Sequence, residues 1–343
     1  MMKKRMLSLI IFAVFMMVTG CAETNQEQQT SEPQEEKEQT QETIRVASWS
    51  QPISEQTNLL VDEDKKFFSE HGLDMEFIPG AGGGDAIKNI LSGQADIAFT
   101  DPGSLLFALD KGEKLKVIYN IYPQNVFNVV SLKEKNLTKP EDLKGKTIGV
   151  YSLSSGTRQN LLVLLHRAGL TENDVKIVET GLLNFAPLMQ GQVDATAATD
   201  TGLLMAKEKG LGDVNVINVK DALNIPSDIF VVTEEVFNEK KDVLQTFLQA
   251  YQNSAEWMIN EPEEAASLAV ENAIDGKEEK RNFEIIRLRN LSSQSELTKE
   301  KGLGALDVEI FQQAADTYHS LGLIENTLNM SEVVEEDFVP KKQ

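Results

Sequence analysis

Small polar residues and glycines gather at a few turns of the chain, where their types and spacing suit the binding of a small molecule. The clearest group is Ser154-Ser155-Gly156-Thr157, which lies between an apolar extended run and a helical stretch. A hydroxyl at such a position can cap the helix, while the first N–H groups carry partial positive charge and attract a carboxylate, sulfonate or phosphate. The alternative is a helix cap that contacts no ligand.

Further candidate residues follow other extended runs, at the end where α/β sheets form their crevices. Asp101 and Asp200 can accept hydrogen bonds from ligand amino groups or can cap helices, and Trp49 can stack on a planar ligand or fill a core. Arg158, beside a helix start, favours an anion instead, so the charge of the ligand stays open. The predicted ligand-binding residues are Trp49, Gln51, Gly83, Gly84, Thr100, Asp101, Asn125, Ser154, Ser155, Gly156, Thr157 and Asp200.

Patterns typical of catalysis or of cofactor binding are incomplete in this sequence. The glycine-rich run 80–84 is followed by Asp85, where a dinucleotide-binding motif needs its third glycine. Asp200-Thr201-Gly202 resembles an aspartic-protease triplet, but no second copy supplies the other carboxylate. The three histidines are far apart, and one cysteine cannot form a zinc-binding cluster. We therefore predict no enzyme activity, no metal and no cofactor.

The elements around these turns alternate between short apolar strands and amphipathic helices. One such cycle runs from Ile44 to about Tyr122, with a helix predicted over Thr57–His71, and a second runs from Phe127 to about Val219. Alternation of this kind is typical of crossover units and of a largely parallel sheet. The remaining elements are helices, predicted near 239–258, 262–273, 277–290 and 306–322.

Two cycles followed by helices predict an α/β fold of two lobes, with a hinge formed by extended segments near 127–132 and 229–233. Lobe 1 is expected to contain residues 44–128 and 230–325, lobe 2 residues 129–229, and a polar tail residues 326–343. One large doubly wound sheet is the alternative architecture.

The N-terminus has the layout of a secretory signal. Three basic residues, Lys3 to Arg5, precede the apolar run Met6–Val18, and small residues follow before Cys21. The apolar run is shorter than the ~20 residues of a membrane span. The segment resembles a bacterial lipoprotein signal, which implies removal of residues 1–20 and lipidation of Cys21; a plain signal peptide is the alternative.

The residues after Cys21 are expected to be a flexible, acidic tether. Ala22 is the one apolar side chain of residues 22–43, so this stretch cannot bury enough surface to offset the entropy of ordering. Lipidation of Cys21 and a tether over 21–43 predict a protein anchored to the cell membrane on its extracytoplasmic face. Acyl chains hold a protein to the membrane surface without crossing the bilayer.

The charge of the chain excludes one class of partner. The formal net charge is −21, and removal of the three basic residues of the leader leaves about −24. Nucleic acid binding depends on Lys and Arg that neutralise phosphates, so we expect no nucleic acid partner.

Two phrases of the sequence carry a resemblance to a known family. They are Leu91–Asp101, which reads LSGQADIAFTD, and Leu143–Val150, which reads LKGKTIGV; Gln190–Ala195, QGQVDA, echoes the first phrase. They resemble turns of the solute-binding proteins of ABC importers, in the SsuA/THI5-like (NMT1/THI5-like) branch, and the likeness extends over roughly residues 44–325.

The resemblance implies the type II periplasmic-binding-protein-like fold, with two lobes, a hinge and C-terminal helices. It also implies that the cleft closes on a small organic solute, such as a thiamine-precursor pyrimidine or a sulfonate. The implied partner is a membrane permease driven by a cytoplasmic ATPase, and we expect the binding protein to be a monomer.

Two other functional classes remain as alternatives. A surface lipoprotein that acts as an adhesin or scaffold would have no closed crevice for a small molecule. Enzymes related to thiamine-pyrimidine synthesis share the branch, but they need cysteine and histidine clusters that this sequence lacks.

Overall fold

The structure is a computed structural model that describes residues 41–181 and 185–341. The predicted signal of residues 1–20, the lipidation site Cys21 and the tether up to residue 40 lie outside the described residues. Within the described ranges, no helix combines the length and the apolar character that a membrane span needs.

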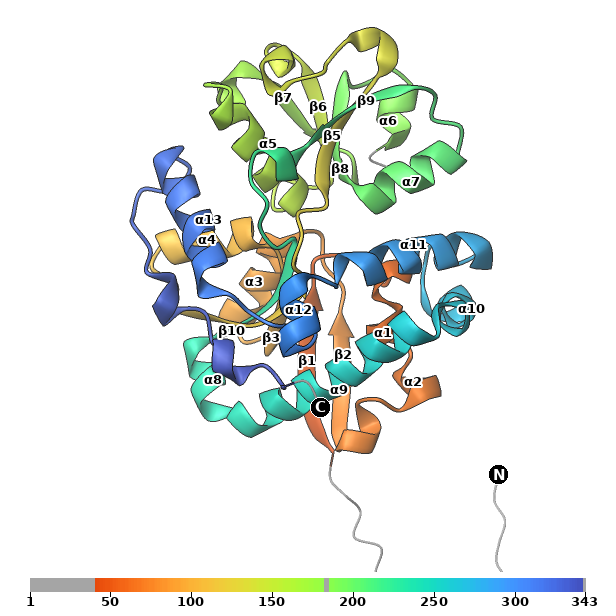
Figure 1. The fold of residues 1–343 in the computed structure, drawn as a ribbon, viewed down its shortest axis with the longest axis vertical. Helices are drawn as coiled ribbons and strands as arrows, with labels where there is room; N and C mark the ends of the chain where they lie inside the picture. Colours follow the sequence, from red (N-terminus) through yellow and green to blue (C-terminus); the bar gives the residue numbers. More distant parts are fainter. Residues whose placement is uncertain (1–40, 182–184, 342–343) are drawn as a thin grey trace, which may run out of the picture. The chain divides into compact units, whose positions relative to one another are not determined.

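The first sheet has five strands, in the order β2-β1-β3-β10-β4 (Figure 1). Its strands β1, β2 and β3 are parallel, whereas β10 is antiparallel to both of its neighbours, β3 and β4. The strands are β1 (Glu42–Ser48), β2 (Leu73–Ile78), β3 (Ile97–Thr100), β4 (Leu115–Tyr122) and β10 (Asp228–Thr233).

The second sheet repeats this plan, in the order β7-β6-β8-β5-β9, with β5 as its antiparallel member. Two separate five-stranded sheets exclude the alternative of one large doubly wound sheet and confirm the prediction of two α/β lobes. The strands are β5 (Phe127–Leu132), β6 (Thr147–Val150), β7 (Lys176–Glu179), β8 (Ala195–Thr199) and β9 (Val214–Asn218).

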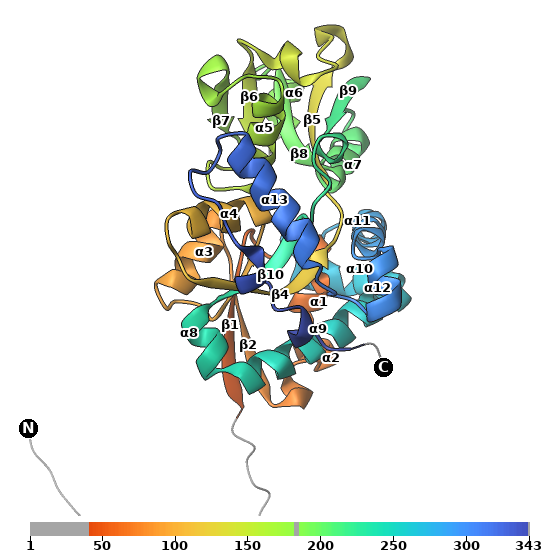
Figure 2. The same cartoon turned by 60° about the vertical axis from the view of Figure 1, so that its left-hand side comes forward.

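Helices cover the sheets of both lobes, and the C-terminal helices belong to the first lobe (Figures 1 and 2). The second lobe contains α5 (Gly156–Arg167), α6 (Phe185–Met189) and α7 (Asp200–Glu208). The first lobe contains α1 (Thr57–Leu60), α2 (Asp62–Lys65), α3 (Gly83–Leu91), α4 (Pro102–Asp110), α8 (Glu234–Glu239), α9 (Lys241–Asn260), α10 (Pro262–Asn272), α11 (Glu279–Ser292), α12 (Glu296–Lys301) and α13 (Val308–Ser320).

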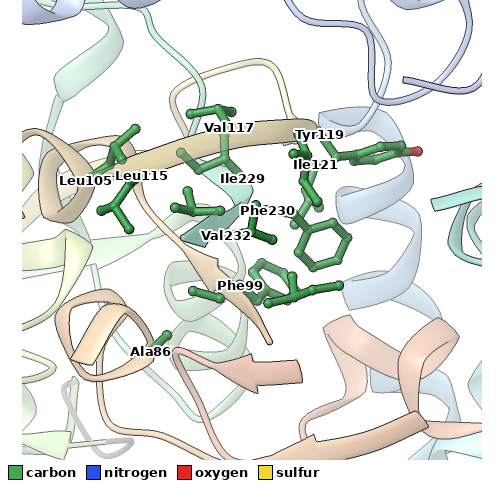
Figure 3. Packing of buried hydrophobic residues seen from close by; sticks show 14 of the residues in the cluster. Ala86, Phe99, Leu105, Leu115, Val117, Tyr119, Ile121, Ile229, Phe230 and Val232 are labelled. Carbon is green, nitrogen blue, oxygen red and sulfur yellow. The ribbon is translucent and has the colours of Figure 1, made fainter. Parts of the chain in front are cut away.

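The core of the first lobe is built around aromatic side chains of its central strands. Phe230 of β10 packs against Phe99 of β3, with ring centroids 5.5 Å apart, and against Tyr119 of β4 at 5.9 Å. Phe247 of α9 adds a further ring contact at 5.4 Å from Phe230. Figure 3 shows Phe99, Tyr119 and Phe230 among aliphatic residues of the same strands. Edge-to-face pairs, such as Phe99–Phe230 and Phe230–Phe247, stabilise a core beyond the area that they bury.

The second sheet is buried on both faces. Because successive side chains of a strand alternate in direction, neighbouring residues of β5 join different clusters. Val129 packs in a cluster with Leu161 of α5, whereas Val130 packs in a cluster with Phe185 of α6 and Ala206 of α7. Coverage by helices on both faces explains why β5 carries buried apolar side chains on both of its faces.

The phrase that the sequence repeats has the same structural role in both lobes. Asp96 accepts the N–H of Arg45 at 3.0 Å, and Asp194 accepts the N–H of Thr147, also at 3.0 Å. Burial opposes ionisation of Asp96, but hydrogen bonds from Arg45 and Lys240 outweigh it and lower the pKa of this carboxyl. Each aspartate therefore fixes the turn before its strand to the neighbouring strand, in keeping with an architectural role.

Two crossings of the chain join the lobes, one between β4 and β5 and one between β9 and β10. The two crossings are hydrogen-bonded to each other through Ser227. Its N–H donates to the carbonyl of Tyr122 at 2.8 Å, and its hydroxyl accepts the N–H of Val126 at 2.9 Å. The side chain of Asn125 donates to the carbonyl of Leu223 at 3.0 Å. This narrow double connection has the geometry that a hinge requires.

The predicted boundaries of the lobes are shifted by one or two residues. β5 begins at Phe127 and pairs in the second sheet, although residues up to 128 were assigned to lobe 1. β10 begins at Asp228 and pairs in the first sheet, although residues up to 229 were assigned to lobe 2. Similarly, β1 begins at Glu42, within the stretch assigned to the tether.

The helix predicted over Thr57–His71 is broken into α1, α2 and a 3-10 turn at Ser69–His71. Lys66 has a φ of 60°, in the left-handed region that ends a helix. The Asp62 carboxylate accepts the N–H of Phe68 at 2.7 Å, which offers the backbone a partner outside the helical pattern. This local competition cannot be read from apolar periodicity.

The described part of the predicted polar tail, 326–341, packs against the first lobe instead of extending into solvent. Met330 and Phe338 are buried in the core of that lobe. The N–H of Val117 on β4 donates to the carbonyl of Val333 at 2.8 Å. A few apolar residues among the acids therefore anchor this segment.

Candidate functional site

A pocket of about 250 Å³ lies between the two lobes and is lined by residues of both. Ligand pockets in proteins typically measure roughly 300–1,000 Å³, so this one suits a small organic molecule. The first lobe contributes Trp49, Ile53, Glu55, Gly82, Gly83, Asp101, Asp228, Asp275, Ile285 and Arg289. The second lobe contributes Phe127, Tyr151, Ser155, Gly156, Thr157, Gly181, Thr199, Thr201, Gly202, Met205 and Lys209.

Aromatic rings form much of the pocket's apolar surface. Trp49 of the first lobe and Tyr151 of the second meet edge to face, with centroids 6.2 Å apart and an interplanar angle of 89°. Phe127, at the start of β5, adds a third ring to the lining. Planar, apolar walls of this kind suit a ligand with a flat ring.

Several helices begin at the pocket. Asp101 caps α4 by accepting the N–H of Ser104 at 2.9 Å, and Thr199 caps α7 by accepting the N–H of Gly202 at 3.4 Å. The helix α5 begins at Gly156. Because the first N–H groups of a helix lack partners within it, these starts provide hydrogen-bond donors and partial positive charge.

Hydroxyl groups of the turn before α5 hold the turn itself. The Ser155 hydroxyl lies 2.7 Å from that of Thr157 and accepts the N–H of Ser152 at 3.1 Å. The Thr157 hydroxyl also accepts the N–H of Tyr151 at 3.0 Å. Ser155 and Thr157 therefore shape the wall and present the start of α5.

Glycines allow the two walls to approach each other. A Cβ atom on Gly156 would lie 2.7 Å from the ring of Phe127 and 3.2 Å from Asp101. A Cβ atom on Gly83 would lie 2.2 Å from the carboxylate of Asp101. Both positions therefore need a residue without a side chain.

Carboxyl groups of the first lobe give the pocket an acidic side. Burial raises the pKa of Asp101 to about 6, although hydrogen bonds from Ser104 oppose the shift. Burial also raises the pKa of Asp228 well above its ordinary value, and the nearby charges of Glu55 and Asp101 add to the effect. Perturbed carboxyls in a cleft are a common mark of a functional site.

Arg289 of α11 links the lobes through a buried cluster. Its Nε donates to Glu55 at 2.9 Å, its Nη1 to Asp200 at 2.7 Å and its Nη2 to the hydroxyl of Thr201 at 2.7 Å. The guanidinium also lies over the ring of Tyr122, 5.3 Å from its centroid. Burial lowers the pKa of Arg289, but the carboxylates of Asp200 and Glu55 outweigh it and raise the pKa. Asp200 and Thr201 belong to the second lobe, so this cluster spans the cleft.

A second contact between the lobes has no charged partner. The N–H of Gly84 donates to the carbonyl of Ser154 at 2.9 Å. The hydroxyls of Ser152 and Ser154 both donate to the carbonyl of Ala81, the latter at 3.3 Å. The lobes therefore meet directly at two places beside the pocket.

The structure brings half of the predicted ligand-binding residues to the pocket and places the other half next to it. Thr100 lies beneath the wall and donates to the carbonyl of Gly83 at 2.9 Å, and Gln51 donates to that of Gly80 at 3.3 Å. Asn125 lies in the crossing between β4 and β5. The pocket is lined by Trp49, Gly83, Asp101, Ser155, Gly156 and Thr157, but not by Gln51, Gly84, Thr100, Asn125, Ser154 and Asp200.

Arg158 lies outside the pocket, so its charge does not decide the ligand. Its guanidinium pairs with Glu172 at 2.6 Å, beside a groove on another side of α5. The conflict between this arginine and the aspartates, which the sequence left open, therefore does not arise at the pocket.

Five charged residues of the lining, Glu55, Lys209, Asp228, Asp275 and Arg289, escaped the sequence analysis. Asp228 stands directly before an apolar strand, at a crossing of the chain, which is a weak but readable signal. Arg289 lies in a helix with several other charged residues, and nothing in the spacing marks it as the buried one. Glu55 lies in the short 3-10 turn Ser54–Gln56, where no pattern indicates burial.

Comparison with protein families gives a match over residues 53–265 to the family described as NMT1/THI5 like. The match includes the whole of the second lobe and both crossings between the lobes.

Two curated relatives are similar over most of this chain. The riboflavin-binding protein RibY of Chloroflexus aurantiacus is 22% identical over 349 residues, which cover 99% of this chain and 99% of RibY. The formylaminopyrimidine-binding protein of Halalkalibacterium halodurans is 24% identical over 251 residues, which cover 72% of this chain and 74% of the relative.

Among solved structures, the periplasmic aliphatic sulphonate binding protein SsuA from Escherichia coli is similar, with a TM-score of 0.66 and 15% identity. The superposition covers 85% of this chain and 96% of SsuA. At this identity the likeness shows a shared fold, and it confirms the predicted periplasmic-binding-protein-like architecture.

Proposed function

The chain belongs to the NMT1/THI5-like family, and from this premise we propose that it is an extracytoplasmic solute-binding lipoprotein of an ABC importer. One observation carries the proposal above all others: a pocket that both lobes line, beside a narrow double crossing of the chain. Closure of two lobes around a ligand is a standard use of such a hinge. A ligand stabilises the closed form through contacts that it makes better in that form.

The features of the pocket favour a small planar molecule that carries both donors and acceptors of hydrogen bonds. Trp49 and Tyr151 provide flat apolar contact, the start of α5 provides donors, and Asp101 provides an acceptor. A riboflavin-type ring or a pyrimidine meets these requirements, in agreement with the names of two relatives, a riboflavin-binding and a formylaminopyrimidine-binding protein. A sulfonate, the ligand class of SsuA, would find donors at the helix starts but would also face the carboxyls.

The proposal includes the lipid anchor and the transport partner. Lipidation of Cys21 would attach the protein to the extracytoplasmic face of the cell membrane, with residues 22–40 between the lipid and β1. A permease with a cytoplasmic ATPase would receive the solute, and the binding protein itself would act as a monomer without enzyme activity. Acylation is tested by mass spectrometry of the full chain extracted from membranes, where Cys21→Ser should abolish the lipid.

Solute binding is tested by titration calorimetry and thermal shift of the full chain in detergent, with riboflavin, a formylaminopyrimidine and ethanesulfonate as probes. Saturable binding of one of them, with a rise in melting temperature, supports the proposal. Absence of binding to every probe would contradict it and would favour the adhesin or scaffold alternative.

Substitutions in the turn before α5 test more sharply whether the solute binds in this pocket. The double variant Ser155→Ala/Thr157→Ala removes the hydroxyls that hold the turn, so affinity should fall about tenfold, at ~1–3 kcal/mol for each lost bond. The matched control is Thr171→Ala, because Thr171 caps an exposed 3-10 turn outside the pocket. Equal loss in both variants would show that the binding site lies elsewhere.

A further inference from the structure

Asp228 is a buried carboxyl group without a hydrogen-bond partner. It begins β10 at the second crossing of the chain, its residue is 7% exposed, and it lines the pocket. Among residues 41–181 and 185–341, no group donates a hydrogen bond to its carboxylate. Buried polar groups are nearly always paired in folded proteins, so this one points to a partner that is not part of the chain.

The surroundings of Asp228 make its burial costly. Glu55, Asp101 and Asp200 all lie close enough to disfavour its charge, and Arg289 offers only partial relief. A buried polar group without a hydrogen-bond partner destabilises the fold, and more so when it is ionised, so an unpaired carboxyl at this place suggests a role other than stability. The pairing of β10 with β4 is irregular at this position, because its register shifts between Asp228 and Ile229.

Among the described residues, none places a free cation in the interior of the pocket, where it could receive an anion. Arg289 and Lys209 are the positively charged residues among the described lining. The three donor nitrogens of Arg289 are committed to Glu55, Asp200 and Thr201, and Lys209 is exposed to solvent. An oxyanion in the pocket would therefore lie near Asp228 and Asp101 without a cation to pair with.

We infer that Asp228 is a specificity-determining residue, which selects a solute that presents a hydrogen-bond donor, such as a ring N–H, an amine or an amidine, and rejects sulfonates. The inference rests on the proposed solute-binding function and assigns the ligand class of the same pocket. Asp101 lines the same side of the pocket, but its carboxylate already accepts the N–H and the hydroxyl of Ser104. Asp228 is therefore the carboxyl with its acceptor capacity still available.

The test compares Asp228→Asn with the wild type and with Asp221→Asn, which changes an exposed aspartate before the same crossing. The probes are 4-amino-5-hydroxymethyl-2-methylpyrimidine and riboflavin, which carry N–H donors, and ethanesulfonate, which carries none. Calorimetry gives the affinity of each full-chain variant, and thermal melting of the ligand-free proteins gives their stability.

We expect a donor-bearing probe to bind the wild type, its affinity to fall at least about tenfold in Asp228→Asn, and Asp221→Asn to bind as the wild type does. Ligand-free Asp228→Asn should melt no lower than the wild type, because it replaces a carboxyl group that no group of the described residues pairs. A carboxyl with a merely structural role would lower the melting temperature when replaced.

Two results would overturn the inference, and they differ in what they leave standing. Tighter binding of ethanesulfonate than of either donor-bearing probe, or equal affinity of Asp228→Asn and the wild type for such a probe, removes the selective role but keeps solute binding. Failure of all three probes to bind the wild type removes the proposed function together with the inference.

Discussion

The two walls of the pocket come from lobes with the same strand order, yet they differ in charge. The wall of the first lobe carries four carboxyl groups and Arg289, whereas that of the second carries hydroxyls, glycines and one exposed lysine. Both lobes place a helix start and an aromatic ring at the pocket, but most of its ionisable side chains come from the first lobe. The difference agrees with the proposal that residues of the first lobe select the ligand.

The largest effect on stability is expected at the ion pairs of Arg289, which join the two walls. Arg289→Met leaves Glu55 and Asp200 without their buried cation, so the free energy of unfolding should fall by about 3–5 kcal/mol. Urea unfolding followed by circular dichroism measures the loss. Arg287→Met, on the exposed side of the same helix, is the matched control and should change the stability little. Equal stability of Arg289→Met and Arg287→Met would contradict the role of the Arg289 cluster in joining the two walls.

The next effect depends on pH and belongs to the wall of the first lobe. The pKa of Asp101 is about 6 in the folded protein and about 4 in the unfolded chain. Its contribution to the free energy of unfolding is therefore fully present at low pH. This contribution, about 3 kcal/mol, is lost as the pH rises from about 4 to about 7. Asp101→Asn should weaken that fall in stability, measured by urea unfolding across the pH range. An unchanged pH profile would contradict the assignment.

A smaller effect is expected when the gap between the walls is filled. Gly156→Ala brings a methyl group against Phe127 and Asp101, and such overpacking should lower the free energy of unfolding by about 1–3 kcal/mol. Solute affinity should fall as well, because the wall of the second lobe must move outward. Gly212→Ala, where the added methyl group meets nothing within 4 Å, provides the control for thermal melting and calorimetry.

The smallest effect is expected at the uncharged contact between the lobes. Ser154→Ala removes one long hydroxyl bond to Ala81, while the backbone bond from Gly84 to the Ser154 carbonyl stays. We expect a loss of no more than about 1 kcal/mol in closure, seen as an affinity change of less than about fivefold. A loss of free energy as large as that expected for Arg289→Met would show that the uncharged contact contributes as much as the charged one.

The sequence predicts the fold better than it predicts the pocket, for a physical reason. Alternating strands and helices indicate two α/β lobes whatever the direction of each strand. The search for ligand contacts, however, assumed that strands reach the crevice by their carboxyl ends. β10 runs antiparallel to β3, with Ile229 opposite Thr100, so its first residue, Asp228, reaches that edge instead. Long-range pairing decides strand direction, and local composition does not show it.

Residues contributed by the C-terminal helices are the hardest to predict from sequence. α11 contains Arg281, Arg287 and Arg289, and only the fold shows that Arg289 is buried while Arg287 is exposed. By contrast, the turn before α5 could be recognised, because its hydroxyls and glycine follow one strand and open one helix. Motifs that lie within a single turn are therefore predictable, whereas contacts between distant segments are not.

The position of β10 between β3 and β4 also constrains the order in which the molecule can assemble. The strands β5 to β9 are continuous in the chain, so the second sheet can close as soon as Asn218 has emerged. Until β10 is available, β3 and β4 face each other across a gap, with edges open to pairing with other chains. In a chain that grows from its N-terminus, the second sheet therefore has all its strands before the first, which is complete only when Thr233 has been added.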